Sequence, residues 1–459
     1  MRPQRARWSS SIFLLAILAS LGVAGASWAQ APAGAPPAVP PAPVPAAPVY
    51  VPPAPASPPP AAAPAPAPAA VPAAPAVTPP PAASMPMVPV ATPFKVETPT
   101  GTLRIGLLLQ PQYSIVGSPA LNGNSENLYL RRMRILVTGT MFGRFDYFVD
   151  TDSPNLFLSG APTTGDMFGP ALKTGAGMAI QDAFITYKPL ADMKPLADAL
   201  KIDAGYMLPP MAHNAIQGAT TLYSWDYFTY TFQHTNAFGA ALAPVGRDLG
   251  VQVRGLVVDG HIEYRAGMFQ GLRERASATD VAARNFFRVT ARLQVNLFDP
   301  EPGFFYAGTY FGTKKILSVG GSYDFQDSYK YYAGDAFLDM PVGPGVLTAQ
   351  VEVAHWDGGT FLVAPEAAAM AAVPALPKQT AISGEAGYTF LPVKISPIVR
   401  FDHLSSIGAT GATSRYGGGL AFWPYGHSSN LKLFYTRVQV ENAAHGFNQV
   451  NLQWQLFFL

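Results

Sequence analysis

Polar and apolar residues alternate one by one over many segments of this chain. Residues 287–297 read FRVTARLQVNL, in which Arg288, Thr290 and Arg292 share one face and aliphatic side chains share the other. The segments RDLGVQVRG, HIEYRAGM and QVNLQWQLFFL repeat this pattern. A period of two residues is that of a β-strand with one face in water and one face against apolar material. Because no helical periodicity is sustained after Gly101, the sequence predicts an all-β fold.

Three arginines within one such segment limit the possible environments further. The stretch NLYLRRMRILVTGTMFGRFDYFVD contains Arg131, Arg132 and Arg134 among apolar residues. Moving a charged side chain out of water without a partner costs several kcal/mol, so at least one face of this sheet must meet water. A soluble sandwich and a membrane barrel both satisfy that requirement, since either can have one wet and one dry face.

The number and spacing of the strands favour the membrane barrel. After Gly101 the sequence contains sixteen candidate strands of about nine to twelve residues, the length that crosses a bilayer at a tilt. They begin near Thr102, Leu128, Arg144, Met178, Leu200, Arg247, His261, Phe287, Lys315, Tyr329, Gly345, Ala381, Val393, Arg415, Asn430 and Gly446. Short turns tend to alternate with long loops, except for a long connection over residues 299–314 and a short one near Gln326. An open sheet edge in hydrocarbon would leave backbone groups unpaired, so we expect a closed transmembrane antiparallel barrel around an aqueous lumen.

The residues before Gly101 have a different composition. Residues 1–29 contain three arginines, a short apolar run and a final Ser-Trp-Ala, which predicts a secretory signal peptide cleaved before Gln30. Residues 30–100 are dominated by Pro, Ala and Val and are expected to be a disordered, polyproline-like linker. The linker is either a spacer toward the cell wall or a simple disordered connection. Residues 101–459 are expected to form the barrel domain.

Charge and cysteine content argue against several classes of function. The chain has 30 basic and 28 acidic residues and no cysteine, and the basic excess lies in the predicted signal peptide. A clustered basic face, which nucleic-acid binding requires, is therefore not expected. The seven histidines are scattered, and neither a GxSxG nor an HExxH motif occurs. We expect no enzymatic activity, no metal and no cofactor.

The phase of each strand predicts which charged residues face the lumen. Arg132 and Arg134 share the inner phase, whereas Arg131 falls on the outer phase and is expected at the membrane rim, with its charge reaching the headgroups. The predicted pore-lining residues are Arg132, Arg134, Asp146, Asp182, Asp203, Arg254, Glu263, Arg265, Arg288, Arg292, Glu352 and Arg400. Both signs of charge are present, which indicates a transverse field and weak selectivity rather than a ring of one sign.

Four segments carry a family resemblance. In order along the chain, LYLRRMRILVTGTMFGRFDYFVD, IQDAFITYKPL, LKIDAGYMLPPM and GRDLGVQVRG resemble the phosphate-selective porin O/P family. The resemblance covers most of residues 102–298. It implies a sixteen-stranded, homotrimeric channel in the outer membrane of a Gram-negative bacterium, with the loop after the fifth strand folded inward as a constriction.

In this chain that loop spans residues 209–246. It contains TLYSWDYFTYTF, which is too aromatic for a freely solvated loop, so it either packs inside the barrel or covers a neighbouring subunit. The constriction candidates are Tyr223, Trp225, Asp226 and Tyr227. The loop has no lysine, although the resemblance implies lysines at the constriction of phosphate-selective members. We therefore expect passive diffusion of small hydrophilic solutes and ions with a slight anion preference, and a phosphate preference is implied by the resemblance alone.

Two alternatives of other classes stay open. The first is a structural barrel that anchors a linker bound to the cell wall, and the second, less favoured, is an outer-membrane enzyme. The expected partners of the channel are outer-membrane lipid, small hydrophilic solutes or anions, further copies of the chain in a homotrimer, and the cell wall through the linker.

Overall fold

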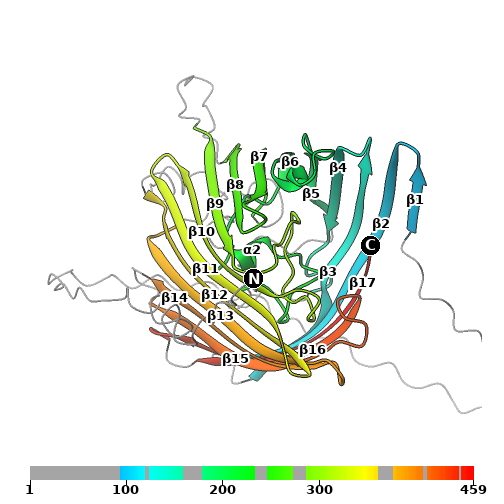
Figure 1. The fold of residues 1–459 in the computed structure, drawn as a ribbon. Coiled ribbons are helices and arrows are strands. Elements are labelled where there is room, and N and C mark those ends of the chain that lie inside the picture. Colours follow the sequence, from blue (N-terminus) through cyan, green and yellow to red (C-terminus); the bar gives the residue numbers. More distant parts are fainter. Residues whose placement is uncertain are drawn as a thin grey trace, which may run out of the picture. The chain divides into compact units, whose positions relative to one another are not determined.

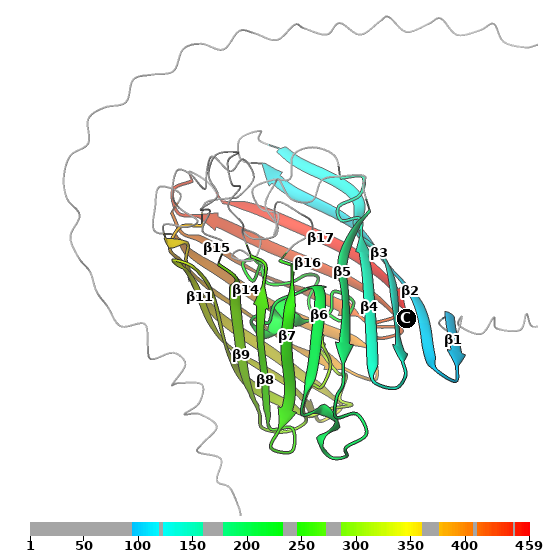
Figure 2. The same ribbon diagram turned by 90° about the horizontal axis from the view of Figure 1, so that it is seen from above.

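The computed structural model describes residues 94–118, 123–158, 178–232, 246–271, 286–359, 376–406, 411–443 and 446–459. These residues form one antiparallel sheet that closes into a barrel (Figure 1 and Figure 2). The predicted signal peptide and the linker up to residue 93 lie outside the described residues. Among the described residues, no helix is long and apolar enough to cross a membrane.

The sheet contains seventeen strands, of which β2 to β17 form the barrel wall. The strands are β1 (Phe94–Thr98), β2 (Gly101–Ser118), β3 (Gly123–Met141), β4 (Phe145–Asp152), β5 (Ala179–Tyr187), β6 (Lys201–Met207), β7 (Asp248–Val257), β8 (Ile262–Phe269), β9 (Arg288–Asn296), β10 (Ile316–Gln326), β11 (Tyr329–Val342), β12 (Gly345–Asp357), β13 (Gln379–Phe390), β14 (Ile395–Ser406), β15 (Thr413–Phe422), β16 (Ser429–Val440) and β17 (Phe447–Phe458). Two short helical turns, η1 (Leu196–Asp198) and α2 (His213–Ile216), lie in the connections that flank β6. The predicted sixteen-stranded antiparallel barrel is confirmed.

The barrel closes where β17 pairs with β2. This pairing runs from Gln449 opposite Val116 to Phe458 opposite Leu107, and β9 pairs with β10 to complete the ring. The first residues of β2 extend beyond the end of β17, and β1 pairs with them. Strand β1 thereby satisfies a backbone edge that β17 does not reach. Regular structure begins at Phe94, ahead of the boundary that the composition predicts at Gly101.

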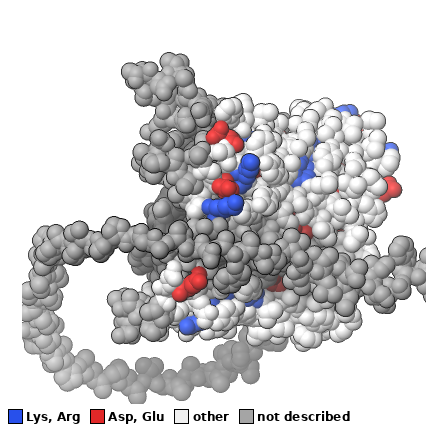
Figure 3. Space-filling model, turned by 90° about the vertical axis from the view of Figure 1, so that its left-hand side faces the viewer, with Lys and Arg blue, Asp and Glu red and all other residues white. Residues whose placement is uncertain are grey.

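The two faces of the wall differ as the alternation predicts. Along β9, Arg288 is fully buried and Arg292 is almost so, whereas Leu293 and Val295 are exposed on the outer face. The outer face carries large apolar side chains around the ring, and charged groups are sparse on the side seen in Figure 3. Strands that separate lipid from a polar lumen have this arrangement, with apolar side chains on the outer face and polar side chains on the inner face.

Several connections depart from the alternation of short turns and long loops, and two of them are the exceptions that the sequence indicates. Strands β10 and β11 are joined by Asp327 and Ser328 alone, at the end of the barrel that also holds the long connections between β4 and β5, β6 and β7, β8 and β9, and β12 and β13. Strands β9 and β10 are joined by a long connection at the opposite end, which we call the turn side. Both exceptions are visible in the sequence, and neither changes the number of strands.

Candidate functional site

The loop between β6 and β7 lies inside the barrel. We call its described part, residues 209–232, the inward loop. It contacts widely separated parts of the wall: Gln110 Nε2 on β2 donates to Ala219 O at 3.4 Å, Lys432 Nζ on β16 donates to Ser224 O at 2.9 Å, and Thr231 Oγ1 donates to Glu352 Oε2 on β12 at 2.9 Å. The loop therefore crosses the lumen. Residues 233–245 of the predicted loop lie outside the described residues.

The predicted constriction residues lie at the buried centre of this loop. Tyr223, Asp226 and Tyr227 are buried, and Trp225 packs against Ile398 and Phe434 of the wall. The Tyr227 hydroxyl donates to Gln217 O at 2.8 Å. Aromatic side chains with a satisfied polar group provide large contact area at low entropic cost, which explains how so long a loop holds one position.

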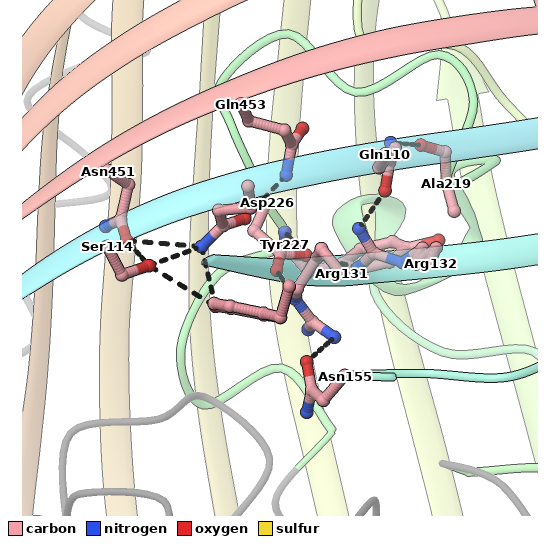
Figure 4. Close-up of polar contacts among 12 residues, drawn as sticks. Gln110, Ser114, Arg131, Arg132, Asn155, Ala219, Asp226, Tyr227, Asn451 and Gln453 are labelled. Carbon is pink, nitrogen blue, oxygen red and sulfur yellow. Dashed lines mark hydrogen bonds and ion pairs between the residues drawn. The ribbon is translucent and has the colours of Figure 1, made fainter. Parts of the chain in front are cut away.

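Asp226 joins the inward loop to β3 through two arginines (Figure 4). Arg131 Nε donates to Asp226 Oδ2 at 2.8 Å, and Arg132 Nη2 donates to Asp226 Oδ1. Arg131 also reaches Asn155 Oδ1 at 3.1 Å, and Arg132 reaches Gln110 Oε1 at 2.9 Å. The side chains of both arginines and of Asp226 are at most 2 % exposed. We call this group the arginine clamp.

A β-bulge makes the clamp possible. The register between β2 and β3 shifts at Gln110 and Pro111, so that Gln110 lies opposite Arg132 and Pro111 lies opposite Leu130. Arg131 is the extra residue of the bulge, and its side chain points inward together with that of Arg132. The prediction that Arg131 lies on the outer face at the membrane rim was wrong, because strict alternation does not hold across a bulge.

The two arginines keep Asp226 ionised. Burial alone would raise the pKa of Asp226, but the charges of Arg131 and Arg132 and the hydrogen bond from Arg132 lower it to about 2. The Tyr227 backbone N–H adds a further hydrogen bond at 2.9 Å. A carboxylate with two guanidinium partners and a backbone donor is a strong tether between a loop and a wall.

The other predicted pore-lining residues face the interior in pairs along the wall. The ion pairs, by their N–O distances, are Arg134–Asp150 at 2.7 Å, Arg134–Asp152 at 3.1 Å, Arg247–Asp182 at 3.2 Å, Arg254–Asp203 at 2.8 Å, Arg265–Glu263 at 2.7 Å, Arg288–Asp324 at 2.7 Å, Arg292–Asp335 at 2.6 Å and Arg400–Asp402 at 2.9 Å. Glu352 accepts from the hydroxyl of Thr231. Asp146 is the exception to burial, being partly exposed and bonded to Lys188 Nζ at 2.7 Å.

Arg400 also belongs with the inward loop. Its Nη1 donates to Asp226 O at 2.7 Å and its Nη2 donates to Tyr227 O at 2.5 Å. Thus Arg132 and Arg400 reach the loop from β3 and β14, whereas Arg134, also on β3, pairs with Asp150 and Asp152 of the wall strand β4. The pattern of alternation identifies which of these residues face inward, but not which of them meet the loop.

A second segment inside the barrel was not predicted. We call residues 300–313, in the connection between β9 and β10, the crossbar. Arg265 on β8 donates to Phe304 O at 2.8 Å, while Asp339 on β11 accepts from the Tyr310 backbone N–H at 2.7 Å. The only sequence signals for it are its unusual length on the turn side and its composition, PGFFYAGTYFG.

Acidic groups outnumber basic ones in the described interior. Among the described residues, the buried charged side chains comprise fourteen acidic groups and ten basic groups, and the partly buried Arg400 adds one more base. No three histidine or acidic side chains in the described ranges are close enough to hold a metal ion. The described interior is thus a field of paired charges with a moderate acidic excess.

Comparison with known proteins identifies the fold. No protein-family model matches the chain, and no curated protein matches it. Among solved structures it is similar to an anion-selective porin from Comamonas acidovorans, with a TM-score of 0.52 at 9% identity over 78% of this chain and 100% of that chain. It is also similar to Salmonella typhi OmpF in complex with daunomycin, with a TM-score of 0.48 at 10% identity over 80% of this chain and 100% of that one.

The outer membrane channel DcaP of Acinetobacter baumannii gives a TM-score of 0.46 at 11% identity, over 80% of this chain and 100% of that chain. At such low identities the likeness to the Comamonas acidovorans structure supports the porin fold and nothing finer. The resemblance to the phosphate-selective O/P family has no matching family model behind it.

Proposed function

We propose that this chain is an outer-membrane porin that forms a water-filled channel for passive diffusion of small hydrophilic solutes and ions. The observation that carries the proposal is the closed sixteen-stranded wall with an apolar outer face and charged side chains directed inward. Such a wall is stable only if its outer face meets lipid and its inner face meets water or polar partners. The outer membrane of a Gram-negative bacterium is the corresponding location.

The inward loop is the proposed constriction. Its aromatic residues occupy the lumen between β3 and β14, and the arginine clamp fixes its centre. Because nearly every arginine named above has a carboxylate partner, the field across the channel is that of paired charges. The acidic excess among the described residues argues against the slight anion preference expected from the sequence and against the phosphate preference that the resemblance implies. Because most of these charges are paired, we propose weak selectivity.

Planar-bilayer recordings of the refolded protein test both parts of the proposal. We expect stable single-channel steps, and a reversal potential near zero in a salt gradient, with no block by added phosphate. A strong anionic reversal potential or block by phosphate would restore the phosphate-selective assignment. Absence of conductance from a correctly folded barrel would reject the channel.

A structural barrel is the second candidate. It is favoured by one observation, namely that the inward loop and the crossbar both cross the lumen and are hydrogen-bonded to each other. In that case the barrel would anchor the linker, which would bind the cell wall. A folded barrel without conductance that sediments with purified cell wall through residues 30–93 would support this role.

A homotrimer is the proposed assembly, and it is supported by the family resemblance. Cross-linking of the refolded protein in lipid, followed by electrophoresis without heating, tests it: a trimer band is expected, and a monomer at every cross-linker concentration contradicts it.

A further inference from the structure

The crossbar spans the lumen between nearly opposite parts of the wall. At one end, the guanidinium of Arg265 on β8 donates to Phe304 O at 2.8 Å and to Gly303 O at 3.1 Å. At the other end, Thr309 O is bonded to His427 Nε2 at 2.9 Å, directly before β16. Strands β8 and β16 are eight positions apart in the sixteen-stranded ring, which places them on opposite sides.

Aromatic packing holds the middle of the crossbar in place. Phe304 lies 4.3 Å from Phe184 between ring centroids, and Phe305 lies 5.6 Å from Phe148. Both partners are inward-facing side chains of β5 and β4. A connection that only joined two strands outside the barrel would need none of these contacts.

The crossbar is also bonded to the inward loop. The Tyr306 backbone accepts from Gly218 N at 2.9 Å and donates to Ile216 O at 3.2 Å, and Gly308 N donates to Thr221 O at 2.9 Å. These are backbone-to-backbone contacts, so no side-chain rearrangement alone would open a gap between the two segments.

A buried histidine strengthens this junction. His213 Nε2, on the inward loop, is bonded to Glu301 Oε2 of the crossbar at 2.9 Å. The imidazole ring lies between Tyr306 and Phe337, with centroid distances of 4.6 Å and 4.2 Å. The crossbar is therefore fixed to the wall at its two ends and along its middle, and it is also fixed to the inward loop.

We propose that the crossbar is a second constriction, in series with the inward loop, that limits the size of solutes at the turn side of the channel. This rests on the proposed channel function. The inward loop enters from the end with long connections and the crossbar enters from the turn side, so a solute must pass beside both. The channel accordingly accepts small ions and small polar molecules. Larger oligomeric solutes are excluded by the inward loop and the crossbar together, including solutes that could pass either segment alone.

The absence of cysteine from the chain allows a direct test in the intact channel. A Pro302→Cys substitution places a thiol on an exposed part of the crossbar, at a position that needs no backbone N–H. A Met193→Cys substitution is the matched control, because Met193 is exposed in the other long turn-side connection, between β5 and β6. Each variant is recorded in a planar bilayer before and after a bulky, uncharged thiol reagent is added.

Modification of the Pro302→Cys channel should remove most of its conductance in discrete steps, while the modified Met193→Cys channel should conduct as before. An uncharged reagent makes the loss steric rather than electrostatic. The proposal is overturned if mass spectrometry shows that the Pro302→Cys thiol has reacted and conductance is unchanged, or if that thiol stays unreactive while the Met193→Cys thiol reacts. Absence of channels before any reagent is added would reject the channel function itself, which is a different outcome.

Shortening the crossbar tests the second constriction by an independent experiment. Replacing residues 301–312 with a short Gly-Ser linker should increase single-channel conductance and admit larger sugars into proteoliposomes. An equal shortening of residues 189–199 should change neither. If the shortened crossbar folds and conducts like the unmodified protein, the second constriction does not exist, and if it fails to fold, the cysteine experiment still decides the question.

Discussion

Strands β3 and β9 both carry inward-facing arginines, yet they use them differently. On β9, strict alternation directs Arg288 and Arg292 to carboxylates of two other wall strands, β10 and β11. On β3, alternation places Arg132 on the inner face, the bulge adds Arg131 beside it, and both pair with Asp226 of the inward loop. Regular alternation thus provides arginine–carboxylate ion pairs between wall strands. The extra residue of the bulge, Arg131, provides a second positive charge beside Arg132, and the two together hold the inward loop.

The largest expected effect comes from removing the shared carboxylate. Asp226→Ala takes the carboxylate from two buried guanidinium groups at once, which should cost about 3–5 kcal/mol of stability. Asp335→Ala on the β9 side should cost less, because it takes the carboxylate from one guanidinium group, that of Arg292. Neutral partners remain in both variants, Gln294 and Ser322 for Arg292, and Asn155 and Gln110 for the clamp. Urea unfolding in lipid vesicles, followed through tryptophan fluorescence, measures both. Equal losses would mean that the clamp is no stronger than an ordinary wall pair.

The outer faces of the two strands should respond alike, because the bulge changes only the inner face. Ile135→Arg on β3 and Leu293→Arg on β9 each place a charge on an exposed apolar position of the outer wall. A charge near the bilayer midplane of a barrel costs roughly 2–4 kcal/mol, so both variants should fold poorly. The fraction with the fast electrophoretic mobility of unheated barrels reports folding, and Ile135→Val and Leu293→Val are the controls. Normal folding of either arginine variant would show that its strand has the opposite orientation.

A smaller effect is expected from Arg131 alone. Arg131→Met leaves Asp226 with Arg132, so the loss should be about 1.5–3 kcal/mol, the range of a hydrogen bond to a charged group. Arg104→Met is the control, since Arg104 is exposed on β2. Indistinguishable unfolding curves for the two variants would contradict the clamp and support a position of Arg131 at the membrane surface.

The wall is predictable from the sequence because lipid on one side and polar groups on the other impose a two-residue period on every strand. The interior segments are predictable only in part. The aromatic content of the inward loop indicates that it needs a packing surface, but both the barrel interior and a neighbouring subunit provide one. The sequence signals for the crossbar are the length of a connection where a short turn is expected and the aromatic segment PGFFYAGTYFG within it.

The position of Arg131 could have been questioned from its neighbour across the sheet. Pro111 has no backbone N–H, and proline within a sheet is confined to edges and bulges. Its place near the end of the predicted strand that begins at Thr102, and well inside β2 of the structure, is therefore a signal for a bulge, but the sequence does not tell which residue of the partner strand is the extra one. Strand β1 was missed for another reason, since FKVET is only five residues long and follows a proline-rich segment.

The smallest effect concerns the pH dependence of the clamp. The pKa of Asp226 is about 2 in the folded protein against 3.8 for an unperturbed carboxyl. Because the folded pKa is lowered, the ionised carboxylate contributes stability that is complete above about pH 5 and is lost progressively as the pH falls toward 2. The stability difference between the unmodified protein and Asp226→Asn should thus be constant from pH 7 to about 5 and shrink by on the order of 2 kcal/mol between about pH 5 and 2. Asp192→Asn, at an exposed residue of the turn side, controls for general effects of acid. If this stability difference stays constant down to pH 2, or has already vanished at pH 5, the two arginines do not stabilise the charge of Asp226. The contrast between β3 and β9 would then rest on geometry alone.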